Sequence, residues 1–216
     1  MIIKPRSIGG TDCNIIMGGD PIKLENLRKE FRGEVEREDL SKVWAVQLGK
    51  WTESLHLDWV CPPTEDTKDQ FVAREGIGYD GGTAHVHATT DRIDDAHEIG
   101  ILWEAKHTNS RSTMRDMVNR YYPQLQHQLY CMDLNSVNFS VIFGSDEPTF
   151  IQIDRDDAYI GRMHSYLCGF LDSVIHDIPF TTARAEPVTA KSKGLTLFAD
   201  MEGNNRRGGV IAGFFF

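Results

Sequence analysis

The pattern of apolar and polar positions along the chain predicts alternating groups of helices and strands. Apolar residues recur three and four positions apart, as on one face of a helix, in the segments 11–17, 22–31, 41–60, 114–132 and 156–178. Short runs rich in β-branched and aromatic residues predict strands at 71–74, 84–89, 101–106, 137–143 and 149–153. Helices come first, a strand meander follows, and a helix, two strands and a last helix complete the order. This order predicts an α/β fold with one central mixed β-sheet flanked by helices.

Residues at the ends of these segments set their expected limits. Thr11 is predicted to cap the first helix, and Gly18 and Gly19 are predicted to end it. Ser41 is expected to open one continuous helix that runs to the prolines beginning at Pro62. Pro123 lies inside the fourth helical segment and leaves open a break in that helix.

Length and composition fit one folded domain. The chain has 216 residues, of which 40% are hydrophobic and 25% charged, ordinary values for a globular protein. We expect one folded domain at 1–187 and a glycine-rich tail of unknown role at 188–216. No apolar run is long enough to span a membrane, and the start lacks a leader pattern, so we expect a soluble, cytoplasmic protein without a membrane partner. The four cysteines form no Cys-x-x-Cys, which argues against a zinc ribbon or a redox motif.

Charge is unevenly distributed. The net charge of −9 argues against a protein that coats nucleic acid. Residues 33–100 hold 15 acidic and 6 basic side chains, whereas residues 101–130 hold 4 basic and 2 acidic ones. This mildly basic strip, with Arg111 and Arg115, is a candidate for local contact with DNA, although charge runs are more often solvated faces.

The strand 101–106 carries the first candidate site. Side chains alternate along a strand, so Glu104 and Lys106 should share a face while Ala105 points the other way. Asp91 lies thirteen residues before Glu104, and the segment between them resembles the turn of a hairpin. Two carboxylates and a backbone carbonyl are ligands that Mg²⁺ accepts, and Lys106 would then lie beside the bound water. The alternative is a solvated strand with a surface ion pair.

Two helices carry further candidates. Glu53 stands among apolar neighbours of the 41–60 helix, where a carboxylate needs either a metal ion or a buried basic partner. Gln124 and Gln128, four residues apart, share one helix face and can bind a water or a phosphate, or form a polar face only. His85 and His87 share a strand face, but without a third ligand, packing or DNA contact is favoured over zinc.

Five motifs occur in order along residues 4–176. They are Arg6-Ser7-Ile8-Gly9-Gly10-Thr11-Asp12, Gly49-Lys50-Trp51-Thr52-Glu53, Asp91, Glu104-Ala105-Lys106 and Tyr122-Pro123-Gln124-Leu125-Gln126-His127-Gln128-Leu129. In order and spacing, these motifs resemble the lambda-exonuclease family, also called YqaJ-type viral recombinases, of the PD-(D/E)XK nuclease superfamily. The resemblance implies a PD-(D/E)XK nuclease-like core.

The resemblance also implies roles for the matching residues. Asp91 and Glu104 match the metal-binding acids, and Ala105 supplies a carbonyl ligand. Lys106 matches the catalytic lysine, and Glu53 matches a helix-borne acid at the metal site.

Further roles concern the substrate. Gln124 matches the glutamine near the attacking water, and Gln128 is expected to be one of the residues that contact DNA. Thr11 matches a hydroxyl residue that helps to hold a 5′ phosphate, and either Lys4 or Arg6 could supply the basic partner. The chain departs from the family around the first acid, because Thr90 and Arg92 stand where proline and glycine are usual.

The resemblance implies a Mg²⁺-dependent 5′→3′ exonuclease on linear double-stranded DNA, with Mn²⁺ as an acceptable substitute. Its product would be a 3′ overhang for a single-strand annealing protein, as in phage recombination, in the host cytoplasm if the protein is phage-encoded. The resemblance further implies a homo-oligomer in the form of a trimeric ring around DNA. Two alternatives are a structure-specific endonuclease of the same superfamily and a DNA-end-binding module that does not cut.

Overall fold

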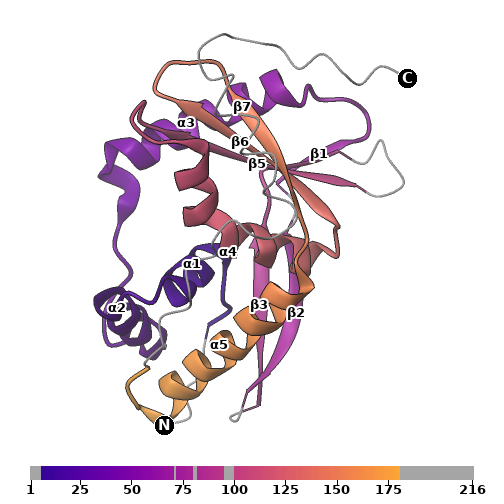
Figure 1. Ribbon diagram of the computed structural model, residues 1–216. Helices are drawn as coiled ribbons and strands as arrows, with labels where there is room; N and C mark the ends of the chain where they lie inside the picture. Colours follow the sequence, from indigo (N-terminus) through magenta and orange to yellow (C-terminus); the bar gives the residue numbers. More distant parts are fainter. Residues whose placement is uncertain (1–5, 71, 80–81, 95–99, 181–216) are drawn as a thin grey trace. The chain divides into compact units, whose positions relative to one another are not determined.

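A computed structural model of the protein describes residues 6–70, 72–79, 82–94 and 100–180 (Figure 1). The predicted tail at 188–216 and Lys4 lie outside these residues, so the proposed division of the chain stays a prediction. Within the described residues, no helix has the length and the apolar character needed to cross a membrane.

The central mixed sheet is confirmed and has five strands in the order β1-β4-β5-β6-β7. Its strands are β1 (Thr67–Asp69), β4 (Arg92–Asp94), β5 (Ile101–Thr108), β6 (Ser136–Phe143) and β7 (Thr149–Asp154). β5 pairs in parallel with β6, and the other neighbours are antiparallel. β1 and β4 were not expected, because three residues are too few to show a strand period.

The strands predicted at 71–74 and 84–89 do not join this sheet. They form a separate hairpin of β2 (Val72–Tyr79) and β3 (Gly82–Thr89). The segment that precedes the first helix extends this hairpin, since Ile8 pairs with Val86 in a parallel bridge. The backbone N–H of Ile8 donates to the carbonyl of His85 at 3.1 Å, and that of His87 donates to Ile8 at 2.8 Å. This bridge fixes the glycines that follow Ile8 beside β3.

The helices follow the predicted pattern, with corrections at their ends. They are α1 (Gly10–Gly18), α2 (Pro21–Arg32), the short 3₁₀ helix η1 (Leu40–Lys42), α3 (Trp44–Val60), α4 (Met114–Met132) and α5 (Asp157–His176). Thr11 does not cap α1: the cap is Gly9, whose N–H donates to the Asp12 carboxylate at 2.9 Å. The helix expected from Ser41 is interrupted by the extended backbone of Val43, and α4 continues unbroken through Pro123.

Helices cover both faces of β5. Trp103 and Ala105 point towards α3, where they pack against Leu57 and Cys61. Because neighbouring side chains on a strand point to opposite faces, Glu104 and Lys106 face the other side, where α4 lies. Figure 1 shows α4 between the five-stranded sheet and the β2–β3 hairpin, and it contacts both.

The core around α4 is apolar except for a few bonded polar side chains. Leu125 and Leu129 of α4 are fully buried, as are Phe139 of β6 and Leu167 of α5. His127 is also fully buried, and its Nε2 lies 2.9 Å from the carbonyl oxygen of His87, to which it donates. The helix is thereby bonded to β3 by an imidazole that must stay neutral.

The buried imidazole of His127 should make stability depend on pH. Burial lowers the pKa of His127 from 6.5 to about 4. The unfolded chain therefore takes up this proton first, and the contribution of the neutral ring is complete above about pH 6.5 and lost as pH falls towards 4. A shift of this size corresponds to roughly 3 kcal/mol. The variant His127→Gln should lose less free energy of unfolding than the unmodified protein between pH 7 and pH 4.5, measured by urea denaturation.

His85→Gln is the matched control for this measurement, because His85 lies on the same strand as His87 but its side chain is exposed. Its pH profile should follow that of the unmodified protein. If the free energy of unfolding of the unmodified protein and of His127→Gln changed with pH in parallel, the buried His127 ring would not be a source of the pH dependence.

Candidate active site

The buried carboxylate of Glu104 lies at the centre of the candidate site. Only 1% of the residue is exposed. Its Oε1 accepts hydrogen bonds from the Lys106 ammonium and from Gln124 Nε2, the latter at 2.7 Å. Its Oε2 accepts from Gln128 Nε2 at 2.6 Å. The paired glutamines of α4 therefore hold the acid of β5 in one orientation.

Lys106 is held in its charged form. Its Nζ donates to Glu104 and, at 3.2 Å, to the carbonyl of Ala105, and it lies 5.3 Å from the centre of the Tyr121 ring. Burial alone would lower the pKa of Lys106, but the carboxylates of Glu104 and Asp91 outweigh burial and raise it. The side chain can therefore serve as a fixed positive charge rather than as a base.

Asp91 reaches β5 from the bend that precedes β4. Its Oδ2 accepts a hydrogen bond from the N–H of Ala105 at 2.8 Å. Burial, and then the nearby charge of Glu104, hold the pKa of Asp91 well above its usual range, although Lys106 opposes the shift. The structure therefore brings Asp91 and Glu104 together, as the hairpin interpretation expected, but Asp91 precedes β4 rather than ending β3.

Glu53 approaches the same group from α3. The side chain is half-buried, and burial raises its pKa, with Glu104 adding to the shift and Lys106 opposing it. The Lys106 ammonium contacts Glu104 directly, and its charge also acts on Asp91 and Glu53. In the described part of the chain, no three His, Cys, Asp or Glu side chains converge as a complete metal-ligand set. A cation here would depend on Asp91 and Glu104 together with the Ala105 carbonyl.

The unusual residue after Asp91 has a structural role. Arg92 is only 3% exposed, and its guanidinium bonds Asp69 of β1 at 2.6 Å and Asp58 of α3 at 2.9 Å. It also donates to the carbonyl of Cys61 at 2.6 Å. The arginine therefore ties the C-terminal end of α3 to β4 and to the edge strand β1, and so fixes the helix that carries Glu53.

Sequence reasoning missed Gln70, which stands beside Asp91. Its N–H donates to the Asp91 carbonyl at 3.2 Å, and its φ of 45° is left-handed, a conformation that residues other than glycine seldom adopt. No sequence signal marks this position, because the conformation depends on the pairing of β1 with β4.

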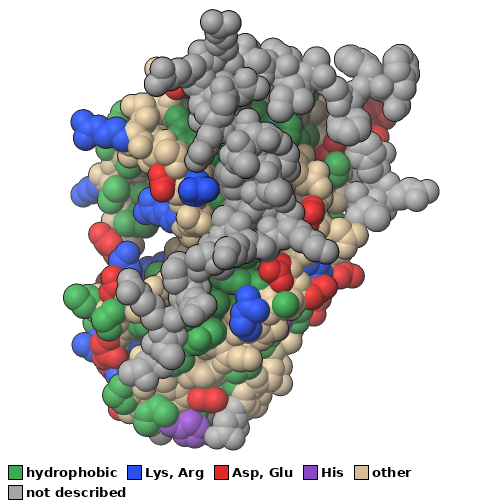
Figure 2. All heavy atoms as spheres, viewed as in Figure 1, with side chains coloured by type: hydrophobic (Ala, Val, Ile, Leu, Met, Phe, Trp, Pro, Cys, Tyr) green, Lys and Arg blue, Asp and Glu red, His purple; other side chains and the backbone are tan. Residues whose placement is uncertain are grey.

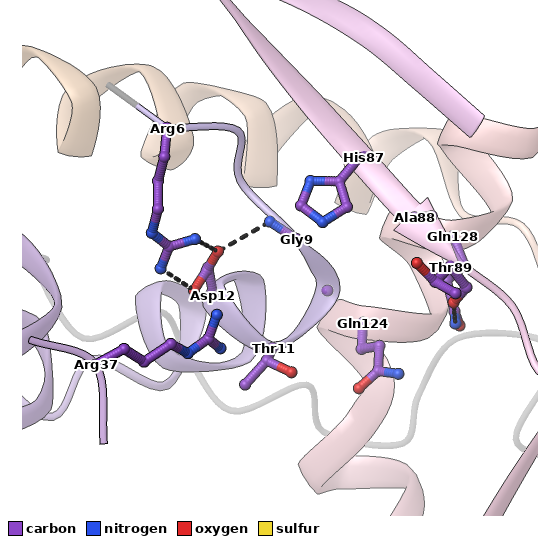
Figure 3. A pocket seen from close by; sticks show the side chains of 11 residues that line it. Arg6, Gly9, Thr11, Asp12, Arg37, His87, Ala88, Thr89, Gln124 and Gln128 are labelled. Carbon is purple, nitrogen blue, oxygen red and sulfur yellow. Dashed lines mark hydrogen bonds and ion pairs between the residues drawn. The ribbon is translucent and has the colours of Figure 1, made fainter. Parts of the chain in front are cut away.

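A pocket of about 180 Å³ opens beside Gln124 and Gln128, the two glutamines that donate to Glu104 (Figure 3). It shares Gln124 and Gln128 with the acid cluster, and its remaining lining residues are Arg6, Gly9, Gly10, Thr11, Asp12, Arg37, His87, Ala88 and Thr89. In the space-filling view, Lys and Arg side chains border a hollow on the left of the molecule, between the regions of α3 and of α1 with α2 (Figure 2).

The two arginines of this pocket differ in their partners. Arg6 donates two hydrogen bonds to the buried Asp12 carboxylate, at 2.8 and 2.9 Å, and stacks 4.0 Å from the centre of the Phe31 ring. Its charge is therefore largely balanced. Arg37 is exposed, points towards Thr11 in Figure 3, and has no ion pair with any residue that the structure describes. Sequence reasoning missed Arg37, because it lies in the acidic stretch between α2 and η1.

The remaining predicted contacts lie apart from the pocket lining. Arg111 is in the loop between β5 and α4, and Arg115 is in the first turn of α4, and both side chains are exposed. Their proposed contact with DNA stays a prediction.

The fold is shared with exonucleases of known structure. An alkaline exonuclease from Laribacter hongkongensis matches with a TM-score of 0.61 and 16% identity, over 79% of this chain and 89% of that one. A phage-related exonuclease from Haemophilus somnus matches with a TM-score of 0.58 and 12% identity, over 81% and 97%. The protein SSO0001 matches with a TM-score of 0.56 and 18% identity, over 88% and 82%.

The structures define the class of fold, an α/β core that this chain has in common with alkaline and phage-related exonucleases. Comparisons with protein-family models and with curated sequences gave no match. At 12–18% sequence identity, the similarity to these structures establishes the fold alone.

Arg92→Met should destabilise the protein by about 2 kcal/mol, because several hydrogen bonds to charged groups are lost while Asp58 and Asp69 remain solvated. Denaturant unfolding at pH 7 measures the difference. Arg120→Met, at an exposed position of α4, should change stability by less than about 0.5 kcal/mol. Equal effects of the two substitutions would show that the Arg92 contacts contribute nothing.

Proposed function

We propose that the protein is a metal-dependent deoxyribonuclease that degrades linear double-stranded DNA from a 5′ end and leaves 3′ overhangs. The observation that carries this proposal is the convergence of Asp91, Glu104 and Lys106 at the middle of β5, with the carboxylates in excess of the ammonium. The fold that the chain shares with two exonucleases supports it.

The donor set suits a hard divalent cation. Asp91 and Glu104 contribute carboxylate oxygens, Ala105 contributes a carbonyl oxygen that faces Lys106, and Glu53 stands nearby. Burial is the main reason that the pKa values of Asp91 and Glu53 are raised, and the nearby charge of Glu104 adds to both shifts while Lys106 opposes them. Mg²⁺, or Mn²⁺ in its place, would balance that charge and would supply Lewis acidity for hydrolysis of the phosphodiester.

The protein side chains then have distinct tasks. Lys106, kept protonated by its acidic neighbours, can stabilise negative charge that develops on the phosphate. Gln124 and Gln128 fix the direction of Glu104, and Gln124 also stands at the border between the acids and the pocket. The orientation of these groups before substrate arrives lowers the cost of reaching the transition state.

The neighbouring pocket suits a terminal phosphate. Thr11 presents its hydroxyl in the first turn of α1, where backbone N–H groups favour an anion. Arg37 adds a cation, whereas Arg6 is engaged by Asp12. A 5′ phosphate in this pocket would place the first phosphodiester near the acids, which favours exonuclease over endonuclease action.

The wider assignments rest on the resemblance to the lambda-exonuclease family. We infer a trimeric ring with Arg111 and Arg115 directed towards DNA, and a single-strand annealing protein as the user of the overhang. The exposed positions of both arginines are consistent with contact to a phosphate backbone.

Asp91→Asn and Glu104→Gln should each remove cleavage and leave DNA binding largely intact, because neutral amides no longer balance a divalent cation. The loss should exceed a factor of about 1,000, as expected when several kcal/mol of transition-state stabilisation disappear. The assay uses a linear duplex labelled at either end, with and without Mg²⁺. Asp146→Asn, at an exposed position of the β6–β7 turn, is the control.

A closed circular duplex in the same assay separates the alternatives. An endonuclease would cut the circle, and a module that only binds ends would cut neither substrate. Near-normal digestion by Asp91→Asn would show that the acid cluster is not the active site.

A duplex with a 5′ phosphate should be digested faster than one with a 5′ hydroxyl, since only the phosphate satisfies Thr11 and Arg37. Thr11→Ala and Arg37→Ala should shrink the ratio of the two rates towards one, chiefly through KM for the phosphorylated end. Arg120→Ala should keep the ratio. Equal rates on both ends with the unmodified protein would show that the pocket does not bind the end.

A further inference from the structure

The imidazole of His87 forms part of the wall of the pocket beside α1. Figure 3 shows it on the β3 side of the pocket, across from Arg37. The backbone of His87 is held at both of its polar groups. Its N–H donates to the carbonyl of Ile8 at 2.8 Å, and its carbonyl accepts from His127 at 2.9 Å. The ring therefore has a fixed origin next to the pocket.

The hydroxyl of Ser7 decides which nitrogen of the His87 ring carries a proton. Ser7 Oγ donates its one hydrogen to the carbonyl of His85 at 2.9 Å. The same Oγ lies 2.8 Å from His87 Nδ1, where it can only accept. In the neutral ring the proton is therefore on Nδ1, and Nε2 holds a lone pair.

The Nε2 edge of the ring faces the start of α1. A Cβ on Gly9 would lie 3.1 Å from both Cε1 and Nε2 of His87, so the glycine at the helix cap is what allows the ring to approach this closely. Among the residues that the structure describes, Nε2 has no hydrogen-bond partner. A ligand that enters the pocket next to the first turn of α1 would meet this nitrogen.

The surroundings keep the His87 ring neutral at pH 7. Burial lowers the pKa of His87, Asp12 opposes this shift, and three arginines add to it. The ionisable groups around the ring come from the segment before α1, from α1, from the segment after α2, from β2 and from α4: Arg6, Asp12, Arg37, Arg74 and His127. His127 is itself neutral, because burial lowers its pKa to about 4.

A neutral His87 with its lone pair on Nε2 distinguishes two kinds of DNA end. Above about pH 6 a terminal phosphate is mostly a dianion, whose oxygens only accept hydrogen bonds. Such an oxygen and the Nε2 lone pair repel each other unless one proton lies between them. A 5′ hydroxyl, in contrast, can donate its own hydrogen to Nε2 without any change in protonation.

We propose that His87 is a phosphate-binding residue of this pocket, and that it holds a 5′ phosphate through one proton that is taken up from solvent on binding. This inference rests on the proposed function of the pocket. The proton lies between Nε2 and a phosphate oxygen, while Ser7 retains the proton on Nδ1. The imidazolium then joins Arg37 in facing the dianion, and the preference for a phosphorylated end strengthens as the pH falls.

Fluorescence anisotropy tests the proposal with two blunt duplexes, one with a 5′ phosphate and one with a 5′ hydroxyl, in EDTA so that neither is cut. The ratio of the two Kd values, hydroxyl over phosphate, should fall between pH 7 and pH 8.5 by up to about tenfold for each pH unit, as uptake of one proton requires. His87→Gln should make the ratio independent of pH, because an amide donates without taking up a proton. His85→Gln, at an exposed position of the same strand, should keep the slope.

Ser7→Ala separates the proton linkage from phosphate binding itself. Without the hydroxyl, the neutral His87 ring can carry its proton on Nε2 and donate to the phosphate with no uptake from solvent. This variant should therefore keep a preference for the phosphorylated end but lose the dependence of that preference on pH. A purely structural role of Ser7 would weaken binding of both ends and leave the slope unchanged.

Nitrogen-15 NMR of labelled histidines gives a second readout. His87 should have its proton on Nδ1 in the free protein at pH 7.5 and should become an imidazolium, or share its proton with the phosphate, when the phosphorylated duplex is added. A free His87 with the proton on Nε2, or a phosphate preference that does not change with pH, would overturn the proposal and leave the phosphate pocket in place. Equal affinity for the two ends at every pH would overturn the pocket on which the proposal rests.

Discussion

The buried carboxylate of Glu104 is the interaction on which the site depends most. With 1% of the residue exposed, it has no water shell, so protein donors must replace the lost hydration. Those donors are Lys106 from the same strand and the two glutamines of α4, Gln124 and Gln128. Gln128 also donates to the carbonyl of Thr89 at 3.0 Å, at the end of β3. Glu104 therefore connects the five-stranded sheet to α4, and Gln128 connects α4 to the end of β3.

Stability alone does not explain this arrangement. A buried ion pair rarely stabilises a fold more than apolar side chains of the same volume, because both charges lose their hydration. Here the negative charge also exceeds the positive charge, because Asp91 and Glu53 are added to Glu104 while Lys106 is the single ammonium. Burial raises the pKa of both added acids. Such a cluster is costly in the folded protein unless a cation joins it. The cost is understandable if the cluster serves chemistry, which needs charged groups oriented before the substrate binds.

The parts of the site that depend on short-range periodicity were accessible from the sequence. Glu104 and Lys106 share a face because strands alternate, and Gln124 and Gln128 share one because helices repeat every 3.6 residues. The rest depends on long-range pairing. Arg37 enters the pocket only because the segment after α2 lies beside α1, and nothing local marks it. The same limit applies to the fold, where β1 and β4 have three residues each and the strands of the β2–β3 hairpin look like strands of any sheet.

The two faces of α3 place different demands on one rigid element. Glu53 on the inner face must keep its distance from Lys106, while the outer face presents Trp51 to solvent. Arg92 holds the C-terminal end of the helix through Asp58, and packing of Leu57 holds its middle against β5. Because these two contacts anchor the helix to the five-stranded sheet, they also fix the position of Glu53 relative to Asp91 and Glu104.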